Sequence, residues 1–253
     1  MAPLPPERYS LSYDDPRLAV LYDVDNPDGP DHDFFRGFAD HLGANRIVDL
    51  GCGTGLLTVT LARAGRTVTG IDPAPAMLER AATRPGGEAV NWVLGTGDVL
   101  TPHTTDLIIM SGNVVMHIIG DDWHTTLAAI ARALTPNGRL VFEARNPAAH
   151  AWKSWNDPVG ERDTPVGLLR ESVTTEPPDE DGVVRMHCHN EFVETGDVLD
   201  VEQSLQFRDR SQIEADLLAA GLVTLNVWSD WAKTPFGGTE AEPLMVFDAA
   251  FPG

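Results

Sequence analysis

The stretch Val48-Asp49-Leu50-Gly51-Cys52-Gly53-Thr54-Gly55 decides the fold of this chain. It contains the end of a short apolar run at 47–50, which predicts a strand, and it precedes a run at 56–64 that predicts a helix ended by Gly65. Glycine allows the backbone to turn sharply and lets a ligand approach without a Cβ in the way. The N-terminus of the following helix adds unpaired N–H donors. This context predicts a strand–loop–helix unit that binds a small ligand.

The remainder of the chain predicts an α/β fold with a doubly wound, mostly parallel sheet of seven strands. Strand-like runs alternate with helix-length segments, as expected for parallel strands joined by helical crossovers. The predicted strands span residues 47–50, 67–71, 90–93, 106–110, 139–144, 223–228 and 244–249. The predicted helices span residues 31–42, 56–64, 76–82, 123–134 and 211–220, and Pro136-Asn137-Gly138 is expected to end the fourth of them.

The pattern changes between about Pro147 and Arg210, where Pro-rich loops and long alternating runs replace the helix–strand alternation. Residues 186–194 and 198–207, separated by Thr195-Gly196-Asp197, predict an antiparallel hairpin. We therefore expect an N-terminal cap segment at residues 1–45, a core formed by residues 46–147 and 210–253, and an inserted antiparallel β-rich segment at residues 148–209.

Composition narrows the class of ligand. The formal net charge is −20, from 38 acidic and 18 basic residues, and such a field repels phosphate backbones, so nucleic acid is not an expected partner. The acidity can equally serve solubility alone. Residues 1–10 are rich in Pro without an apolar signal core, and no stretch approaches the ~18 to 20 apolar residues that span a bilayer. We expect a cytoplasmic monomer or homodimer that acts on a small molecule and not at a membrane.

Two carboxylates discriminate between the cofactors that bind such a glycine loop. Asp49 can accept hydrogen bonds from a cationic amine, and Asp72 ends the next strand, where a carboxylate can accept both hydroxyls of a ribose. A nicotinamide cofactor favours Gly-x-Gly-x-x-Gly or Ala, which requires a small residue at the position of Leu56. Asp49 would also repel a pyrophosphate. S-adenosyl-L-methionine (SAM) has no phosphate and carries an ammonium, so these residues favour SAM.

The same residues resemble known motifs. The stretch 48–55 resembles the first motif of class I SAM-dependent methyltransferases, and Ile71-Asp72-Pro73 with Met77-Leu78 resembles their second. Over most of its length the chain is similar to a group of actinobacterial-type small-molecule methyltransferases. This similarity is carried by Tyr13-Asp14-Asp15-Pro16-Arg17-Leu18-Ala19, Leu21-Tyr22-Asp23, Ser111-Gly112-Asn113, Phe142-Glu143-Ala144-Arg145-Asn146-Pro147 with Trp152 and Trp155, and Ser229-Asp230-Trp231. The resemblance implies a Rossmann-like fold and methyl transfer from SAM, with S-adenosyl-L-homocysteine (SAH) as product.

The resemblance also implies which residues bind the methionine end of the cofactor. Gly51, Cys52 and Gly53 would flank the methionine portion, and Asp49 would lie beside its amine. Tyr22, which precedes the core, would close over this end. After the fourth strand, the residues expected beneath the sulfonium are Ser111, Gly112 and Asn113.

At the nucleoside end, the resemblance implies that Asp72 binds the ribose while Pro73 and Met77 pack near the adenine. The family usually places Gly-Asp after the third strand to accept from the adenine amino group. Alignment of this strand without a gap puts Thr96 at that position, whereas a shift of two residues brings in Asp98. We favour Asp98 for its chemistry and keep Thr96 as the alternative.

Residues for the chemical step are less constrained, because methyl transfer is a displacement for which the protein mainly aligns the nucleophile. His117, after the fourth strand, is a candidate base for a hydroxyl or a protonated amine. It could equally be a core histidine. Arg145 and Glu143 end the fifth strand, at the edge where open α/β sheets bind ligands. Arg145 could bind an acceptor carboxylate or form an internal ion pair.

Other clusters of chemically active residues are better explained as structural. His187 and His189 share one face of a predicted strand, with Cys188 on the other, and no further metal ligands can be assigned to them. We therefore expect no metal site. An aromatic cage for a cationic acceptor is conceivable, although core packing is the commoner role of such residues. Its candidate members are Trp152, Trp155, Trp228 and Trp231.

The sequence thus predicts a SAM-dependent methyltransferase that acts on an O, N or C nucleophile of a small molecule. The β-rich insertion would form a lid on the acceptor side and exclude water. An NAD(P)-dependent oxidoreductase is the first alternative, disfavoured by Leu56 and Asp49. The second is a SAM-binding protein that transfers no methyl group, because residues that indicate a cofactor site do not by themselves indicate an acceptor site.

Overall fold

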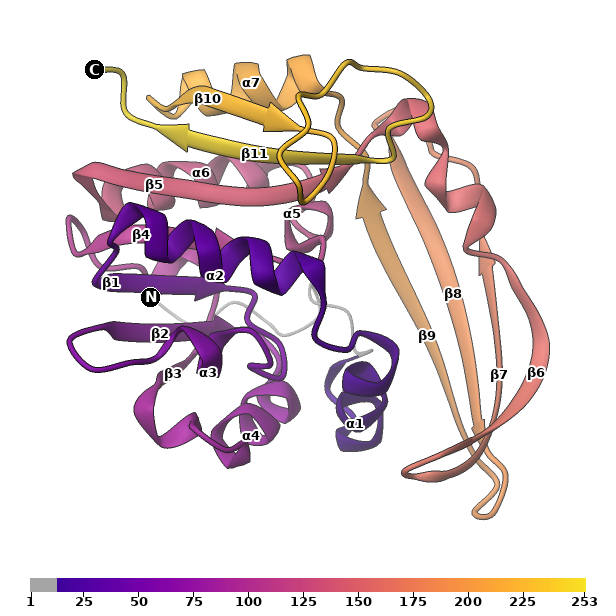
Figure 1. The fold of residues 1–253 in the computed structure, drawn as a ribbon. Helices are drawn as coiled ribbons and strands as arrows, with labels where there is room; N and C mark the ends of the chain where they lie inside the picture. Colours follow the sequence, from indigo (N-terminus) through magenta and orange to yellow (C-terminus); the bar gives the residue numbers. More distant parts are fainter. Residues whose placement is uncertain (1–12) are drawn as a thin grey trace.

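Seven strands form the main sheet of the computed structural model, which describes residues 13–253. Their order across the sheet is β10-β11-β5-β4-β1-β2-β3, and β11 alone runs against the other six (Figure 1). The strands are β1 (Arg46–Leu50), β2 (Thr67–Asp72), β3 (Asn91–Leu94), β4 (Thr105–Met110), β5 (Leu134–Arg145), β10 (Val223–Trp228) and β11 (Leu244–Ala250). The predicted doubly wound, mostly parallel seven-stranded sheet is confirmed.

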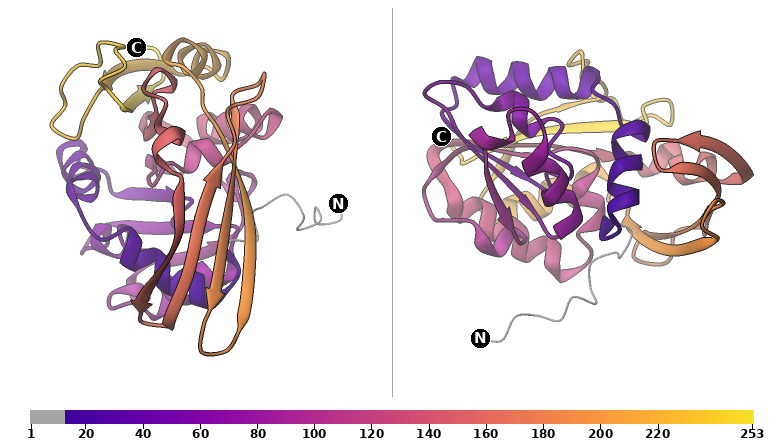
Figure 2. Two further views of the ribbon diagram at one scale, coloured as in Figure 1. Left: turned by 90° about the vertical axis from the view of Figure 1, so that its right-hand side faces the viewer. Right: turned by 90° about the horizontal axis from the view of Figure 1, so that it is seen from below.

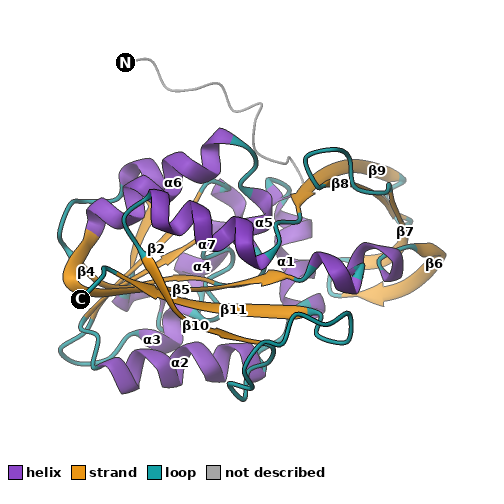
Figure 3. Ribbon diagram, turned by 90° about the horizontal axis from the view of Figure 1, so that it is seen from above, coloured by secondary structure: helices purple, strands orange, loops and turns teal. Residues whose placement is uncertain are grey.

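Helices cover both faces of this sheet (Figure 3). They are α1 (Pro16–Asp25), α2 (Pro30–Leu42), α3 (Thr58–Leu61), α4 (Pro75–Thr83), α5 (Val114–His117), α6 (Asp121–Ala133) and α7 (Arg210–Ala219). On one face, α2 buries Phe34, Phe35 and Phe38, which recur at helical spacing. The left-handed Gly43 ends this helix. On the other face, α6 and α7 pack onto the larger part of the core.

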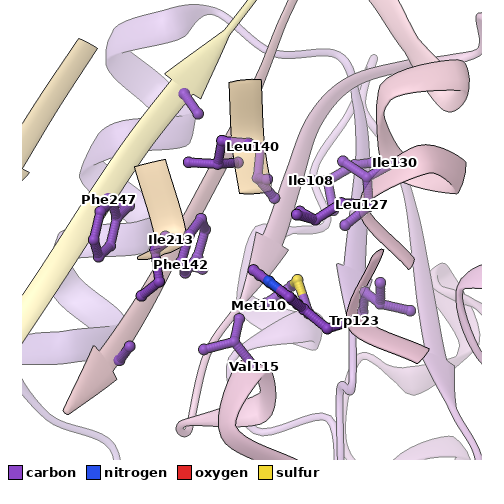
Figure 4. Close-up of a cluster of buried hydrophobic side chains, with 14 of the residues drawn as sticks. Ile108, Met110, Val115, Trp123, Leu127, Ile130, Leu140, Phe142, Ile213 and Phe247 are labelled. Atoms are coloured by element: carbon purple, nitrogen blue, oxygen red, sulfur yellow. The ribbon is translucent and has the colours of Figure 1, made fainter. Parts of the chain in front are cut away.

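Aromatic rings stack at the centre of that larger core (Figure 4). The Phe142 ring of β5 lies parallel to the Phe247 ring of β11, with 5.0 Å between ring centroids. Trp123 of α6 meets the same Phe142 ring edge-on at 6.1 Å. All three side chains are at most 1% exposed. These contacts pack β5 and the antiparallel strand β11 beneath α6.

Two element boundaries differ from the predicted ones. The residues Pro136-Asn137-Gly138 do not end α6; they lie inside β5, which begins at Leu134 directly after the helix. Leu134 is fully buried and pairs with Thr105, and the register of β4 and β5 shifts after that pair. Proline is tolerated in a strand at such an irregularity. The helix predicted at 56–64 is shorter in the structure: α3 ends at Leu61, Ala62 is extended, and the Arg66 guanidinium donates to the carbonyl oxygens of Leu61 and Ala44.

A second, antiparallel sheet is inserted between β5 and α7 (Figure 2). Its strands, in order, are β6 (Asp157–Thr164), β7 (Gly167–Thr175), β8 (Val183–Phe192) and β9 (Asp197–Gln206). The hairpin predicted from alternating residues is β8–β9. The β6–β7 hairpin was not predicted, because β6 is mostly exposed and charged and so lacks a buried apolar face.

Helix α1, also not predicted, lies between the main sheet and the second sheet (Figure 2). Its Arg17 guanidinium stacks 3.9 Å from the centre of the Phe192 ring and pairs with Asp197 at 2.8 Å. On the side of the main sheet, Asp23 pairs with Arg80 and Arg84 of the α4 region at 2.6 Å each. The helix therefore connects the two sheets. Of the predicted cap segment 1–45, residues 1–12 lie outside the described residues.

No helix among residues 13–253 combines the length and apolar character needed to cross a bilayer.

We expect Phe142→Ala to lower the free energy of unfolding by about 3–5 kcal/mol, because a stacked, fully buried ring is replaced by a cavity. Urea denaturation followed by circular dichroism measures the change. Leu218→Ala, which truncates a 65% exposed side chain of α7, is the control and should shift stability by less than about 0.5 kcal/mol. Similar losses in the two variants would contradict the assigned core.

Candidate functional site

The candidate site lies where the sheet order reverses, between β1 and β4. The chain leaves these adjacent strands toward opposite sides of the sheet, and open α/β sheets bind ligands in the crevice formed there. A cavity of about 340 Å³ occupies this place. The predicted site residues in its wall are Tyr22, Gly51, Gly53, Asp72, Pro73, Met77, Thr96, Gly112 and His117. The predicted site residues outside its wall are Asp49, Cys52, Asp98, Ser111, Asn113 and Arg145.

The glycine loop forms the floor of the cavity through a backbone that only glycine adopts easily. Gly51 and Gly53 have φ angles of +78° and +52°. A Cβ on Gly51 would come within 2.5 Å of the Val114 side chain at the start of α5. The amides of Gly51 and Cys52 both donate to the Ile71 carbonyl oxygen, at 2.7 and 3.0 Å. The loop is thus tied to the end of β2, and its exposed surface is backbone.

Cys52 points away from the cavity. Its side chain is 9% exposed, and a Cβ built on Gly70 of β2 would lie 3.0 Å from its Sγ. Burial raises the pKa of this thiol well above its usual value. Only its backbone can therefore contribute to a ligand site.

Asp72 links the glycine loop to the start of α4. One carboxylate oxygen accepts from the Gly53 amide at 2.7 Å, and the other accepts from the Ala74 amide at 2.9 Å. Burial raises the pKa of Asp72 to about 6. Each oxygen keeps a further lone pair, since a carboxylate accepts about four hydrogen bonds. Asp72 therefore lies in the wall with acceptor capacity left over.

Asp49 is buried behind the loop. It is 1% exposed, and one oxygen accepts from the Thr58 hydroxyl at 2.6 Å. Its other oxygen, Oδ1, has no hydrogen-bond partner among the described residues. Burial raises the pKa of this group to about 6. A buried carboxylate with an unused oxygen is costly unless a donor or a cation reaches it.

Two tyrosines and a histidine form the opposite wall. The Tyr22 ring spans the two glycine turns: a Cβ on Gly112 would lie 3.1 Å from its hydroxyl, and one on Gly53 would lie 3.9 Å from its ring. Tyr13 meets the Tyr22 ring edge-on at 5.8 Å and the His117 ring at 6.2 Å. Burial raises the pKa of Tyr13 to about 12 and raises that of Tyr22 as well. Both phenols are neutral hydrogen-bond donors near pH 7.

Tyr13 was not predicted as a site residue. It stands two residues before Asp15, whose carboxylate caps α1 by accepting from the Arg17 amide, with Pro16 at the first helical position. This Asp-Pro start signal could have revealed α1 and placed Tyr13 at its entrance.

His117 ends α5 in the wall of the cavity. Burial lowers the pKa of its imidazole to about 4, so the ring is uncharged near pH 7. A neutral imidazole offers one acceptor and one donor nitrogen. It can accept a hydrogen bond from an acceptor's N–H or O–H inside the cavity.

The turn after β4 is held by two residues of β5. Asn113 has a φ of +61°, which is strained for a residue other than glycine. Its amide donates to Glu143 at 2.6 Å, and its side-chain oxygen accepts from Arg145 at 3.0 Å. No ion pair joins Arg145 to a carboxylate within residues 13–253. The internal ion pair considered for Arg145 is therefore absent from the described part of the chain.

The two candidates for the adenine contact lie beside each other. Thr96 lines the cavity, whereas Asp98 is exposed and outside the wall. The Asp98 carboxylate accepts from the Thr96 hydroxyl at 2.6 Å and from the Thr96 amide at 3.2 Å. Asp98 thereby orients Thr96, and the choice between the two stays a prediction.

The remaining clusters lie away from the cavity. His187 and His189 are partly exposed on the second sheet and face the carboxylates of Glu176 and Asp200. Nowhere in residues 13–253 do three or more His, Cys, Asp or Glu side chains gather so as to hold a metal ion. The four tryptophans form two separate groups, with Trp152 and Trp155 on Phe207 and with Trp228 and Trp231 on Phe34. They build no common cage.

We expect Gly51→Ala to lower the free energy of unfolding by about 2–4 kcal/mol, because the left-handed backbone and the contact with Val114 both penalise a Cβ. Gly43→Ala is the matched control. It has a similar φ of +65° with nothing within 4 Å, and should cost only about 1 kcal/mol. Equal losses in urea denaturation would show that residue 51 does not pack closely against α5.

Comparison with known proteins identifies one domain of the chain and relates the fold to solved structures. Residues 47–138 match the sequence profile of the methyltransferase domain family. A ubiquinone biosynthesis O-methyltransferase of Bradyrhizobium diazoefficiens is 32% identical over 116 residues, which are 45% of this chain and 44% of that protein. The chain thus spans about half the length of the curated relatives it matches.

Two solved structures share the whole architecture. The methyltransferase CcbJ from Streptomyces caelestis superposes with a TM-score of 0.76 over 97% of this chain and 99% of that one, at 19% identity. A SAM-bound amino pentose methyltransferase from Micromonospora echinaspora superposes with a TM-score of 0.62 over 90% and 96% of the two chains, at 21% identity. At these identities the likeness shows the fold. The matched profile identifies residues 47–138 as a methyltransferase domain.

Proposed function

We propose that this protein transfers the methyl group of SAM to an O, N or C nucleophile of a small molecule and releases SAH. The observation that carries the proposal is the charge of the site: Asp49, Asp72 and Glu143 are buried around the cavity. Among residues 13–253, no Lys or Arg lines it. A pyrophosphate would be repelled there, whereas SAM brings an ammonium and a sulfonium. The same feature opposes a nicotinamide cofactor.

Residues along the cavity support binding of SAM. The glycine turn at 51–53 leaves a surface of backbone that a Cβ would fill, and Asp49 behind it has one unused carboxylate oxygen for a cationic amine. The spare lone pairs of Asp72 suit the two ribose hydroxyls. Pro73 and Met77 offer apolar surface to the adenine, with Thr96 or Asp98 at its amino group. The turn Ser111-Gly112-Asn113 would lie beneath the sulfonium.

SAM would supply a methyl group that is already activated, so the residues of this chain align the acceptor and exclude water. Tyr13, Tyr22 and His117 would close the methyl end of the cavity. His117 would accept a proton or a hydrogen bond from the attacking hydroxyl or amine. Its uncharged imidazole also avoids repelling the sulfonium.

Arg145 supports an acceptor that carries a carboxylate. Most arginines of this acidic chain are paired with Asp or Glu, whereas the guanidinium of Arg145 binds only the neutral Asn113 side chain within the described residues. A guanidinium binds a carboxylate through two parallel hydrogen bonds. An acceptor with an amine would be consistent with the fold that this chain shares with an amino pentose methyltransferase. An amine or hydroxyl compound with a carboxylate is therefore the first acceptor class to examine.

We further propose that three parts of the chain have separate roles. Residues 46–147 and 210–253 would bind the cofactor, residues 1–45 would cap it, and residues 148–209 would cover the acceptor. Support comes from α1, which carries Tyr22 into the cavity wall and holds the second sheet through Arg17 and Asp197.

Isothermal calorimetry with SAM and with NADH tests the cofactor, and SAH release over a panel of amines and hydroxyl compounds tests the reaction. We expect the protein to bind SAM and not NADH. Asp72→Asn should bind SAM weaker by roughly 2–3 kcal/mol, because the amide offers a single acceptor atom and no charge. Asp106→Asn, which alters a carboxylate paired with Arg46 outside the cavity wall, should bind SAM normally. Binding of NADH in preference to SAM would overturn the proposal.

Arg145→Gln should raise the KM of a carboxylate-bearing acceptor by roughly ten- to a hundredfold, since a charge-assisted pair is lost while the amide can still donate to Asn113. An analogue without the carboxylate should show no such change. An equal rise in KM for both acceptors would show that Arg145 only supports the turn after β4.

A further inference from the structure

Glu143 is a buried carboxylate whose hydrogen bonds use only part of its capacity. It is 3% exposed, and its Oε1 accepts from the Asn113 amide at 2.6 Å. Its Oε2 is buried and has no hydrogen-bond partner among the described residues. A neutral acceptor such as Gln would satisfy the Asn113 amide equally well. The negative charge therefore needs a reason of its own, because burying it without a partner is costly.

Glu143 lies one peptide behind the cavity wall. Gly112, which precedes the Asn113 bound by Glu143, lines the cavity. Its strand, β5, flanks β4 on one side, and β1 with Asp49 flanks β4 on the other. Both carboxylates have one unused oxygen. The end of β4, where the methionine and sulfonium of SAM would lie, is thus placed between two buried acids.

The groups facing Glu143 do not neutralise it. Tyr22 of α1 is phenolic, and its pKa is raised further, so it stays uncharged. Asp31 of α2 adds a like charge that disfavours ionisation of Glu143. Arg145 of β5 favours ionisation of Glu143, yet its guanidinium binds Asn113 and does not contact Glu143. Within residues 13–253, Glu143 lacks a cation in contact with it.

We propose that Glu143 is a positioning residue for the cofactor: its negative charge attracts the cationic end of SAM across the Gly112–Asn113 peptide, and Glu143 loses its proton as SAM enters. The proposal rests on SAM being the ligand of this cavity. In a medium of low dielectric constant, a charge a few ångströms away acts strongly without contact. Methyl transfer removes the sulfonium charge, so the attraction is weaker for SAH and favours its departure.

The direction of the pH effect follows from the burial of Glu143, which raises its pKa to about 7. In the free protein near pH 7 the group is partly protonated, and a bound cation favours the ionised form. Affinity for SAM should therefore rise as the pH rises through 7 and level off once Glu143 is ionised in the free protein. Asp49 and Asp72, with pKa values near 6, affect only the lower end of this range.

The variant Glu143→Gln keeps the hydrogen bond to the Asn113 amide and removes the charge. We expect it to bind SAM roughly tenfold weaker than wild type at about pH 7.5, and to lose the rise in affinity around pH 7, above the range in which Asp49 and Asp72 titrate. The SAM-to-SAH affinity ratio should fall as well. Glu214→Gln, which removes a surface charge of α7 paired with Arg210, should match wild type. Calorimetry at several pH values measures all of these.

Calorimetry of the wild type in two buffers of different ionisation enthalpy adds a measurement that needs no variant. Near pH 7, SAM should release a fraction of one proton, and more than SAH does. No proton release by the wild type, or unchanged affinity and pH slope in Glu143→Gln, would overturn the positioning role and leave the proposed function intact. Failure of the wild type to bind SAM at all would overturn both.

Discussion

The structure depends on burying acidic side chains at the carboxyl ends of the central strands without basic partners beside them. Asp72 shows how the cost is met: its oxygens accept the amides of Gly53 and Ala74, so the carboxylate fixes both the glycine turn and the start of α4. The cost of burying Asp49 is met only in part, because the Thr58 hydroxyl donates to one of its oxygens and the other oxygen has no partner among the described residues. Buried carboxylate oxygens without hydrogen-bond partners are thus the main feature of the site. Such oxygens suit the positive charge of the proposed cofactor and oppose a phosphate.

The main sheet was predictable because its residues obey local rules. Glycines at positions of positive φ, apolar runs of strand length and amphipathic helices such as α2 all point to the same fold. The predicted element boundaries were wrong where contacts between distant residues determine them. Leu134 pairs with Thr105, and Pro136-Asn137-Gly138 therefore lie inside β5. Helix α3 ends at Leu61, whose carbonyl oxygen accepts from Arg66. The edge strand β6 has no buried face to give a periodic signal. The α1 helix was missed although Asp15 and Pro16 mark its start.

For the candidate site, the part that follows consecutive strands was easier to predict than the part assembled from distant segments. Gly51, Gly53 and Asp72 lie within one strand–loop–helix–strand unit, and the cavity wall contains all three. Tyr13 reaches that wall through contacts with Tyr22 and His117, the latter far along the chain. Nor does the sequence show that Asn113 takes a left-handed turn, or that two residues of β5 hold it. Such relations exist only in three dimensions, so local patterns carry no trace of them.

The second sheet is one continuous stretch of chain between β5 and α7, and it contacts the rest of the fold near the core, at its far end and, through Gln203, at Tyr13. Near the core it packs through Val184 and Leu205, and at its far end it meets α1 through Phe192 and Leu169. Because the stretch is continuous, it could be exchanged without cutting a strand of the main sheet. A replacement would also have to keep the ion pairs Arg17–Asp197 and Arg162–Asp25, which join the second sheet to α1. If the second sheet covers the acceptor as proposed, such an exchange would change the acceptor site and leave the glycine loop and Asp72 unchanged.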